Sequence, residues 1–146
     1  MKIYELLSEA KTDIDIVRDD YARWRELVNI SSATLKKFLD SEEGRVAGLT
    51  PKEARAAGRI KTGRSSARAI LRMRDRGFSE WTSEDVRWMY RQISFISRMS
   101  GLPGPLYKIT DDGKKIPTRK LTSLLVWGHR PAGIKFKIID NHVRLV

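Results

Sequence analysis

Apolar residues recur at helical spacing along the chain as far as Gly101. Between residues 13 and 29 they fall every three or four positions, which predicts an amphipathic helix. A second apolar stripe follows Ser31 or Ser32, either of which can cap the helix that carries it. The pattern is clearest after Thr82, a capping residue that precedes an apolar stripe continuing until Gly101.

Start signals predict two further helices within this region. In TPKEA, residues 50–54, a capping Thr is followed by Pro at the first helical position and Glu at the third, which completes a capping box. This helix must be short, because Gly58 follows soon after. Thr62 or Gly63 opens the next helix, which is predicted to run to Gly77. Its predicted buried edge consists of Ala67, Ile70 and Leu71.

The periodicity changes beyond Gly101. Residues 102–119 are rich in Pro, Gly and Lys and are predicted to form a loop with a turn at 111–114. Residues 120–128 are apolar enough for a short buried helix, although the same run is compatible with a strand.

The C-terminal residues alternate between apolar and basic, with Ile or Phe at 134, 136 and 138 and Lys between them. This pattern predicts a half-buried strand, and Asp140-Asn141 suits the turn into a second strand at 142–146. The expected fold is therefore mainly α, a compact bundle of short helices with a small C-terminal β-hairpin. We expect residues 11–146 to form a single basic helical domain.

Composition removes several classes of function. The chain has 146 residues and no Cys, so disulfides, thiolate catalysis and Cys-based zinc sites are excluded. Its only imidazoles are those of His129 and His142. No apolar run approaches the roughly 20 residues of a membrane span. We therefore expect no metal, no cofactor and no membrane attachment.

Charge is distributed unevenly along the chain. The net charge is +11, but residues 1–50 carry −2 and residues 51–146 carry +13. Such asymmetry indicates an anionic partner, most simply nucleic acid. The alternative is a basic protein that its charge merely keeps soluble.

One predicted helix, between residues 63 and 77, concentrates this charge. Its arginines stand four positions apart, about 6 Å of rise per step, and so form one stripe beside the apolar edge. They are Arg64, Arg68, Arg72 and Arg76. Lys61 and Ser65 lie at the N-terminus of this helix, where backbone N–H groups suit a phosphate. The alternative is an ordinary solvated helix face whose arginines pair with acidic residues from elsewhere.

Two sparser basic groups accompany the stripe. The next helix contributes Arg87, Arg91 and Arg98, and the region after it contributes Lys108, Lys114, Lys115, Arg119 and Lys120. The spacing fits no helix-turn-helix, and basic residues outnumber the Asn and Gln residues that could read bases. We expect weakly specific, salt-sensitive contacts to the nucleic-acid backbone.

The chain offers little for catalysis. In WGHRP, residues 127–131, His129 is a candidate general base, but no nucleophile, carboxylate pair or metal-ligand spacing accompanies it. A histidine that caps a helix end is the alternative, and we expect no enzymatic activity and no small-molecule substrate. The tryptophans could stack on bases but are more typical of a core. They are Trp24, Trp81, Trp88 and Trp127.

A resemblance to known proteins rests on four segments: SSATLKKFLDSEEGRVAGL, KTGRSSARAI, RQISFISRM and LTSLLVWGHRP. In this order they are similar to a family of small uncharacterised bacterial and phage domains, sometimes labelled DNA-binding, over residues 30–131. The resemblance implies a shared fold but no mechanism. Arg130 departs from it, because Asp or Asn is expected at this position in the family.

The chain opens with MKIYELLSEA. This stretch resembles the capsid-targeting leader of internal virion proteins in T-even-type tailed phages, which begins Met-Lys-x-Tyr and ends in a Leu/Ile-x-Glu site before Ala or Gly. The resemblance implies cleavage between Glu9 and Ala10, with Leu7 in the recognised site. It also implies a capsid scaffold and a prohead protease as partners of residues 1–10. The alternative is the first turns of an amphipathic helix that packs on the body.

Together these features predict a phage protein inside the virion head that binds nucleic acid without sequence specificity. Outside the virion it would lie in the host cytoplasm, either before assembly or after ejection with the genome. The alternative is a protein-interaction module, either a virion structural protein or an inhibitor of a host enzyme, that uses the same basic face.

Overall fold

The computed structural model describes residues 13–47, 51–56 and 62–146. The predicted leader, with its cleavage-site residues Leu7, Glu9 and Ala10, lies outside these ranges. So do the predicted capping residue Thr50 and the basic residue Lys61. Within the described ranges, no helix is both long enough and apolar enough to cross a membrane.

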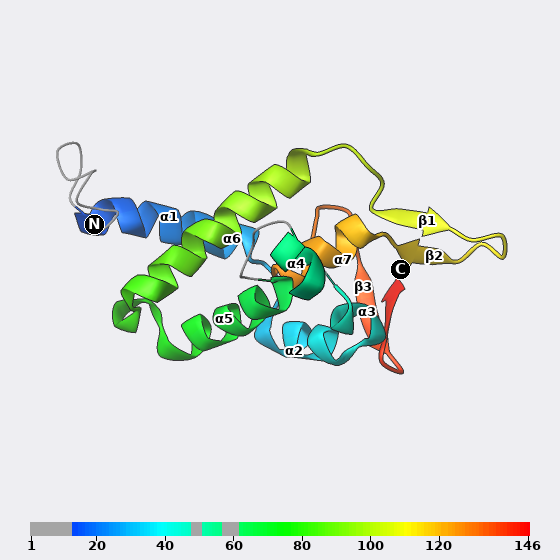
Figure 1. The fold of residues 1–146 in the computed structure, drawn as a ribbon, viewed down its shortest axis with the longest axis horizontal. Helices are drawn as coiled ribbons and strands as arrows, with labels where there is room; N and C mark the ends of the chain where they lie inside the picture. Colours follow the sequence, from blue (N-terminus) through cyan, green and yellow to red (C-terminus); the bar gives the residue numbers. More distant parts are fainter. Residues whose placement is uncertain (1–12, 48–50, 57–61) are drawn as a thin grey trace.

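Helices form most of the described chain (Figure 1). They are α1 (Asp13–Leu27), α2 (Ser32–Asp40), α3 (Glu42–Arg45), α4 (Pro51–Ala56), α5 (Gly63–Arg76), α6 (Ser83–Gly101) and α7 (Arg119–Val126). A short 3-10 turn, η2 (Phe78–Glu80), lies between α5 and α6. Local caps fix several starts, because the side chains of Ser31, Thr62 and Thr82 each accept a backbone N–H from the first turn of α2, α5 and α6.

The strands form two antiparallel hairpins. In the first, β1 (Tyr107–Ile109) pairs with β2 (Lys115–Pro117), and in the second, β3 (Phe136–Ile139) pairs with β4 (His142–Leu145). Asp140 and Asn141 join β3 to β4 with φ angles of 51° and 64°. Asp and Asn tolerate such positive φ values, which two-residue hairpin turns require. The predicted C-terminal hairpin is therefore confirmed, and the fold is mainly α.

Two details of the sequence prediction need correction, at residues 102–119 and at α3. Residues 102–119 are not a continuous loop, because they contain the β1–β2 hairpin and the first residue of α7. The short buried helix predicted within residues 120–128 is confirmed as α7, which ends at Val126, and the strand alternative is not adopted. No helix was predicted at α3, where Gly44 allows close packing: a Cβ at this position would lie 1.7 Å from the Phe38 carbonyl oxygen.

The helices enclose one apolar core. Figure 1 shows α6 crossing in front of α1, with α5 beside it, while the β1–β2 hairpin projects from the end opposite the N-terminus. Phe38 of α2, Ile70 of α5, Met89 of α6 and Leu125 of α7 are completely buried. The core interpretation of the tryptophans holds: Trp24, Trp88 and Trp127 are buried, and Trp81 packs against the same cluster.

The end of α1 is tied to the segment after α7. The Ile30 N–H donates to the Gly128 carbonyl over 3.2 Å, and the His129 Nδ1–H donates to the Leu27 carbonyl over 2.7 Å. His129 therefore caps a helix end, as one sequence interpretation proposed, but the helix is α1 rather than the neighbouring α7. Asn29 accepts the Arg130 N–H over 2.7 Å and reinforces the same junction.

Candidate nucleic-acid interface

A buried polar network joins α1 to α5 and α6, the two helices that carry most of the candidate residues. The Trp24 indole N–H of α1 donates to Gln92 Oε1 of α6 over 2.6 Å. Gln92 Nε2 in turn donates to Ser66 Oγ of α5 over 3.1 Å. Because Ser66 and Gln92 are fully buried, these hydrogen bonds fix α5 and α6 relative to each other. The helices therefore present their outward faces as one rigid surface.

Arg64, the first arginine of the predicted stripe, is held by the protein itself. Its Nη1 donates to the Leu39 carbonyl over 3.0 Å and to the Gly44 carbonyl over 2.7 Å, at the C-terminal ends of α2 and α3. Burial lowers the pKa of Arg64, and the neighbouring charges of Arg68 and Arg45 lower it further, with Asp40 acting in the opposite direction. Arg64 is thus a structural contact that also brings a fixed positive charge to the surface beside Arg68.

Arg76, the last arginine of the stripe, is also engaged. It donates to the buried carboxylate of Asp85, which belongs to the capping box at the start of α6.

Arg74 makes a similar link that the sequence interpretation missed. Its guanidinium donates to the Val28 carbonyl over 2.9 Å and to Ser32 Oγ over 3.3 Å, and burial lowers its pKa.

Arg68 and Arg72 behave as the stripe predicted. Both side chains are exposed, and neither makes a hydrogen bond or ion pair with another residue in the described part of the chain. The prediction of one continuous exposed stripe is therefore wrong at its two ends. The first and last arginines join helices to one another, and the central two face solvent.

The N-terminus of α5 is occupied by its own residues. Thr62 Oγ1 accepts the Ser65 N–H over 3.3 Å, and the two hydroxyls lie 3.2 Å apart. Gly63 packs so closely on α7 that a Cβ would lie 2.4 Å from Val126 Cγ1. Ser65 thus contributes to a local cap at this helix end.

On α6, Arg87 and Arg91 both contact Glu84. Arg87 Nη1 lies 3.2 Å from Glu84 Oε2, and Arg91 Nη1 lies 3.3 Å from Glu84 Oε1. Arg91 also stacks over the ring of Trp88, with 5.1 Å between the guanidinium carbon and the ring centroid. This pair of arginines is therefore oriented by its own helix.

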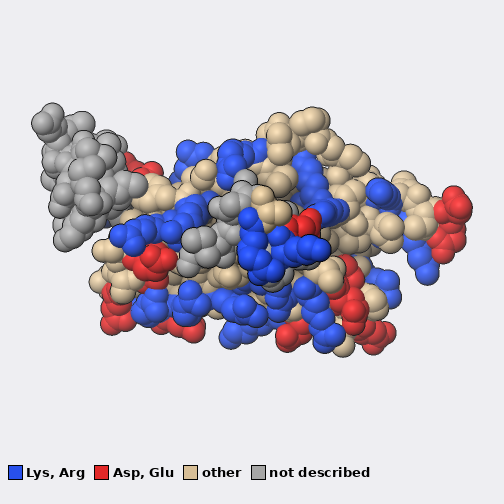
Figure 2. All heavy atoms as spheres, viewed as in Figure 1, with Lys and Arg blue, Asp and Glu red and all other residues tan. Residues whose placement is uncertain are grey.

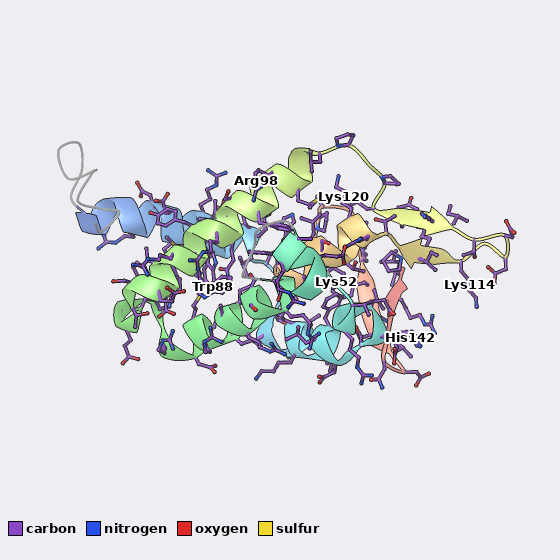
Figure 3. The ribbon with its side chains drawn as sticks, in the orientation of Figure 1. Lys52, Trp88, Arg98, Lys114, Lys120 and His142 are labelled. Atoms are coloured by element: carbon purple, nitrogen blue, oxygen red, sulfur yellow. The ribbon has the colours of Figure 1, made fainter. Side chains whose placement is uncertain are left out.

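The third basic group does not form one cluster. Lys114, near the tip of the projecting hairpin in Figure 3, lies 3.8 Å from Asp112, and Lys115 lies over the Tyr107 ring. Arg119 pairs with a carboxylate of α4, and Lys120 Nζ donates to the Leu102 carbonyl over 2.6 Å. Lys120 therefore holds the C-terminal end of α6.

Exposed basic residues of α4, which the sequence interpretation did not single out, belong to the same surface. Figure 2 shows Lys and Arg side chains gathered over α4, α5 and α6 on one face of the molecule. Lys52 of α4 and Arg98 of α6 lie on this face in Figure 3, and Arg55 of α4 is exposed as well. Arg98 belongs to the sparser stripe predicted with Arg87 and Arg91, whereas α4 is too short to show a stripe. We use the name basic face for those Lys and Arg side chains of α4, α5 and α6 that are exposed or, for Arg91, partly exposed: Lys52, Arg55, Arg68, Arg72, Arg87, Arg91 and Arg98.

Within the described ranges, no three His, Asp or Glu side chains are grouped so that they could hold a metal ion.

These features define a small, basic, mainly α protein whose exposed arginines lie on a rigid helical surface. The chain belongs to the family described as "Protein of unknown function (DUF3140)", whose family model matches residues 23–116. No curated protein matches the chain, and no solved structure does. The match begins within α1, spans α2 to α6 and β1, and ends within β2, but it names no activity.

Proposed function

We propose that the protein binds nucleic acid through the sugar–phosphate backbone, with little preference for sequence. The observation that carries the proposal is the exposure of Arg68 and Arg72, without ion-pair partners among the described residues, next to the fixed charge of Arg64. Fork-shaped guanidinium groups match phosphate oxygens in geometry as well as in charge. Lys52 and Arg55 of α4 extend the same basic face.

Mutual repulsion among the arginines supports an anionic ligand. Burial lowers the pKa of Arg64 most, the charges of Arg68 and Arg45 lower it further, and Asp40 acts against them, so like charges stand within electrostatic range of one another. A phosphate between or beside them would relieve this repulsion. The rigid attachment of Arg64 to α2 and α3 keeps the repulsion from being relaxed by side-chain movement.

The inventory of amide side chains supports low sequence specificity. Asn and Gln are the residues that read adenine in the major groove, and this chain has only Gln92, Asn29 and Asn141. Gln92 is buried in the network between α5 and α6, Asn29 bonds to the Arg130 backbone, and Asn141 forms the β3–β4 turn. None of the three lies on the basic face.

The test is a titration of the full chain with a fluorescent duplex oligonucleotide of arbitrary sequence at several salt concentrations. We expect log K to fall linearly with log salt, and the double variant Arg68→Ala/Arg72→Ala to flatten that slope by about two units for every sequence tried. A matched control, Lys135→Ala/Lys137→Ala, removes the same charge from the C-terminal hairpin and should leave the slope nearly unchanged. Absence of binding at micromolar protein in low salt would overturn the proposal.

The same titration separates the alternative of a protein-interaction module. Poly-glutamate offers negative charge without phosphate geometry, so a backbone-binding protein should prefer the oligonucleotide at equal charge concentration. A preference for poly-glutamate would favour an acidic protein as the partner. A role inside a phage head depends on residues 1–10, which the structure does not describe, and stays a separate prediction of the sequence.

A further inference from the structure

Two arginines of α6 converge on a single carboxylate. Glu84, Arg87 and Arg91 lie on one side of the helix, and each carboxylate oxygen faces a different guanidinium, at 3.2 Å and 3.3 Å. A backbone phosphodiester likewise presents two charged oxygens that can bridge a pair of guanidinium groups. The geometry around Glu84 is therefore one that a phosphate can reproduce.

Arg91 is held in position independently of Glu84. Its guanidinium stacks over Trp88, a side chain buried in the core between α6 and the Trp127 ring. Only 39% of the Arg91 side chain is exposed, against 64% for Arg87. Because its support comes from the core, Arg91 keeps its orientation when the carboxylate moves away, and it loses little freedom on meeting a ligand.

We propose that Arg87 and Arg91 form a phosphate-binding site on α6, and that Glu84 competes with the nucleic-acid backbone for it. This inference rests on the proposed function. It adds that Glu84 lowers the affinity of the protein for nucleic acid. Glu84 is 47% exposed, and exposed ion pairs stabilise a protein little, so a phosphate can displace this carboxylate.

The contrast with Arg76 shows why the competition is specific to this site. Asp85, the partner of Arg76, is only 5% exposed and caps the first turn of α6, so its displacement would unfold a helix end. Glu84 and its two arginines come from one helix, so these two ion pairs can open without any element moving relative to another.

The experiment measures duplex binding by the Glu84→Gln variant against that of the wild-type chain. We expect the dissociation constant to fall about threefold to tenfold at low salt, as removal of one adjacent charge allows. The control Asp111→Asn removes one charge at the tip of the projecting hairpin, far from the start of α6 (Figure 1), and should change affinity little. Thermal unfolding of each variant checks that all remain folded.

The decisive comparison repeats Glu84→Gln in the Arg87→Ala/Arg91→Ala background. If Glu84 acts through these two arginines, its effect on affinity disappears there. An equal gain in both backgrounds, or no gain beyond that of Asp111→Asn, would overturn the inference. If the wild-type chain binds and Arg68→Ala/Arg72→Ala weakens it while Glu84→Gln changes nothing, the proposed function stands and only this site is refuted. If no variant binds, both fail.

Discussion

Replacement of Arg64 by alanine is expected to destabilise the protein, although the residue belongs to a helix face that sequence spacing assigns to solvent. The Arg64 guanidinium donates to the Leu39 and Gly44 carbonyls, which lie at the ends of α2 and α3. Carbonyls at a helix C-terminus have no partner within their own helix. Alanine at position 64 would leave both carbonyls without this donor and would remove a positive charge from the negative ends of the helix dipoles.

The size of the effect follows from the hydrogen bonds lost. Hydrogen bonds to a charged group contribute about 1.5–3 kcal/mol to stability. We take this range for the two bonds together, because the Arg64 side chain is only partly buried. For a protein of this length the corresponding fall in melting temperature is about 3–12 °C.

Thermal unfolding followed by circular dichroism provides the measurement, with Arg68→Ala as the matched control. Arg68 stands one turn further along α5 but is exposed, so its replacement should change stability by no more than about 0.5 kcal/mol. Arg68→Ala should instead weaken duplex binding. Equal melting temperatures for the two variants would show that Arg64 does not join α5 to α2 and α3, and the assignment of its role would have to be abandoned.

Two further substitutions probe packing and ionisation. Gly63→Ala should cost about 1–3 kcal/mol in urea unfolding, because the new Cβ meets Val126 Cγ1 at 2.4 Å. Gly101→Ala, with no atom within 4 Å of the new Cβ, should leave stability unchanged or slightly raised, and a similar loss in both would contradict the packing argument. Burial and the hydrogen bond to Asp20 raise the pKa of Tyr90, so the folded state retains this proton longer than the unfolded chain and stability falls as pH rises above about 10. Tyr90→Phe should flatten that fall in unfolding experiments between about pH 9 and 11, and an unchanged slope would place the loss elsewhere.

The sequence predicted helix starts and the C-terminal turn correctly, because these depend on a few neighbouring residues. Ser31, Thr62 and Thr82 cap their helices because a short hydroxyl side chain can reach the first-turn N–H whatever the rest of the protein does. The turn at Asp140-Asn141 is equally local, because these residue types accept the positive φ that the turn demands. Such signals place the elements along the chain without any knowledge of their packing.

The roles of individual arginines could not be obtained in this way. Helical spacing groups Arg64 with Arg68. The carbonyls that bind Arg64 come from α2 and α3, however, and the residue pattern within α5 contains no information about contacts with other helices. The strands of the projecting hairpin were missed because three residues are too few to show an alternation. The sequence therefore predicted where the positive charge lies. Only the packed structure shows which arginines join helices to one another and which face solvent.

The position of α7 in the core has a consequence for synthesis of the chain. Leu121, Leu125 and Val126 are completely buried, and the loop after α7 is bonded to the end of α1 through His129. When translation proceeds from the N-terminus, α1 to α6 therefore emerge before the helix that fills their centre. The nascent chain cannot complete its core until the segment around His129 has been made, because contacts so distant in sequence form only when both partners are present. The core is thus expected to close in one late step, after residues 119–129 have emerged, rather than helix by helix during elongation.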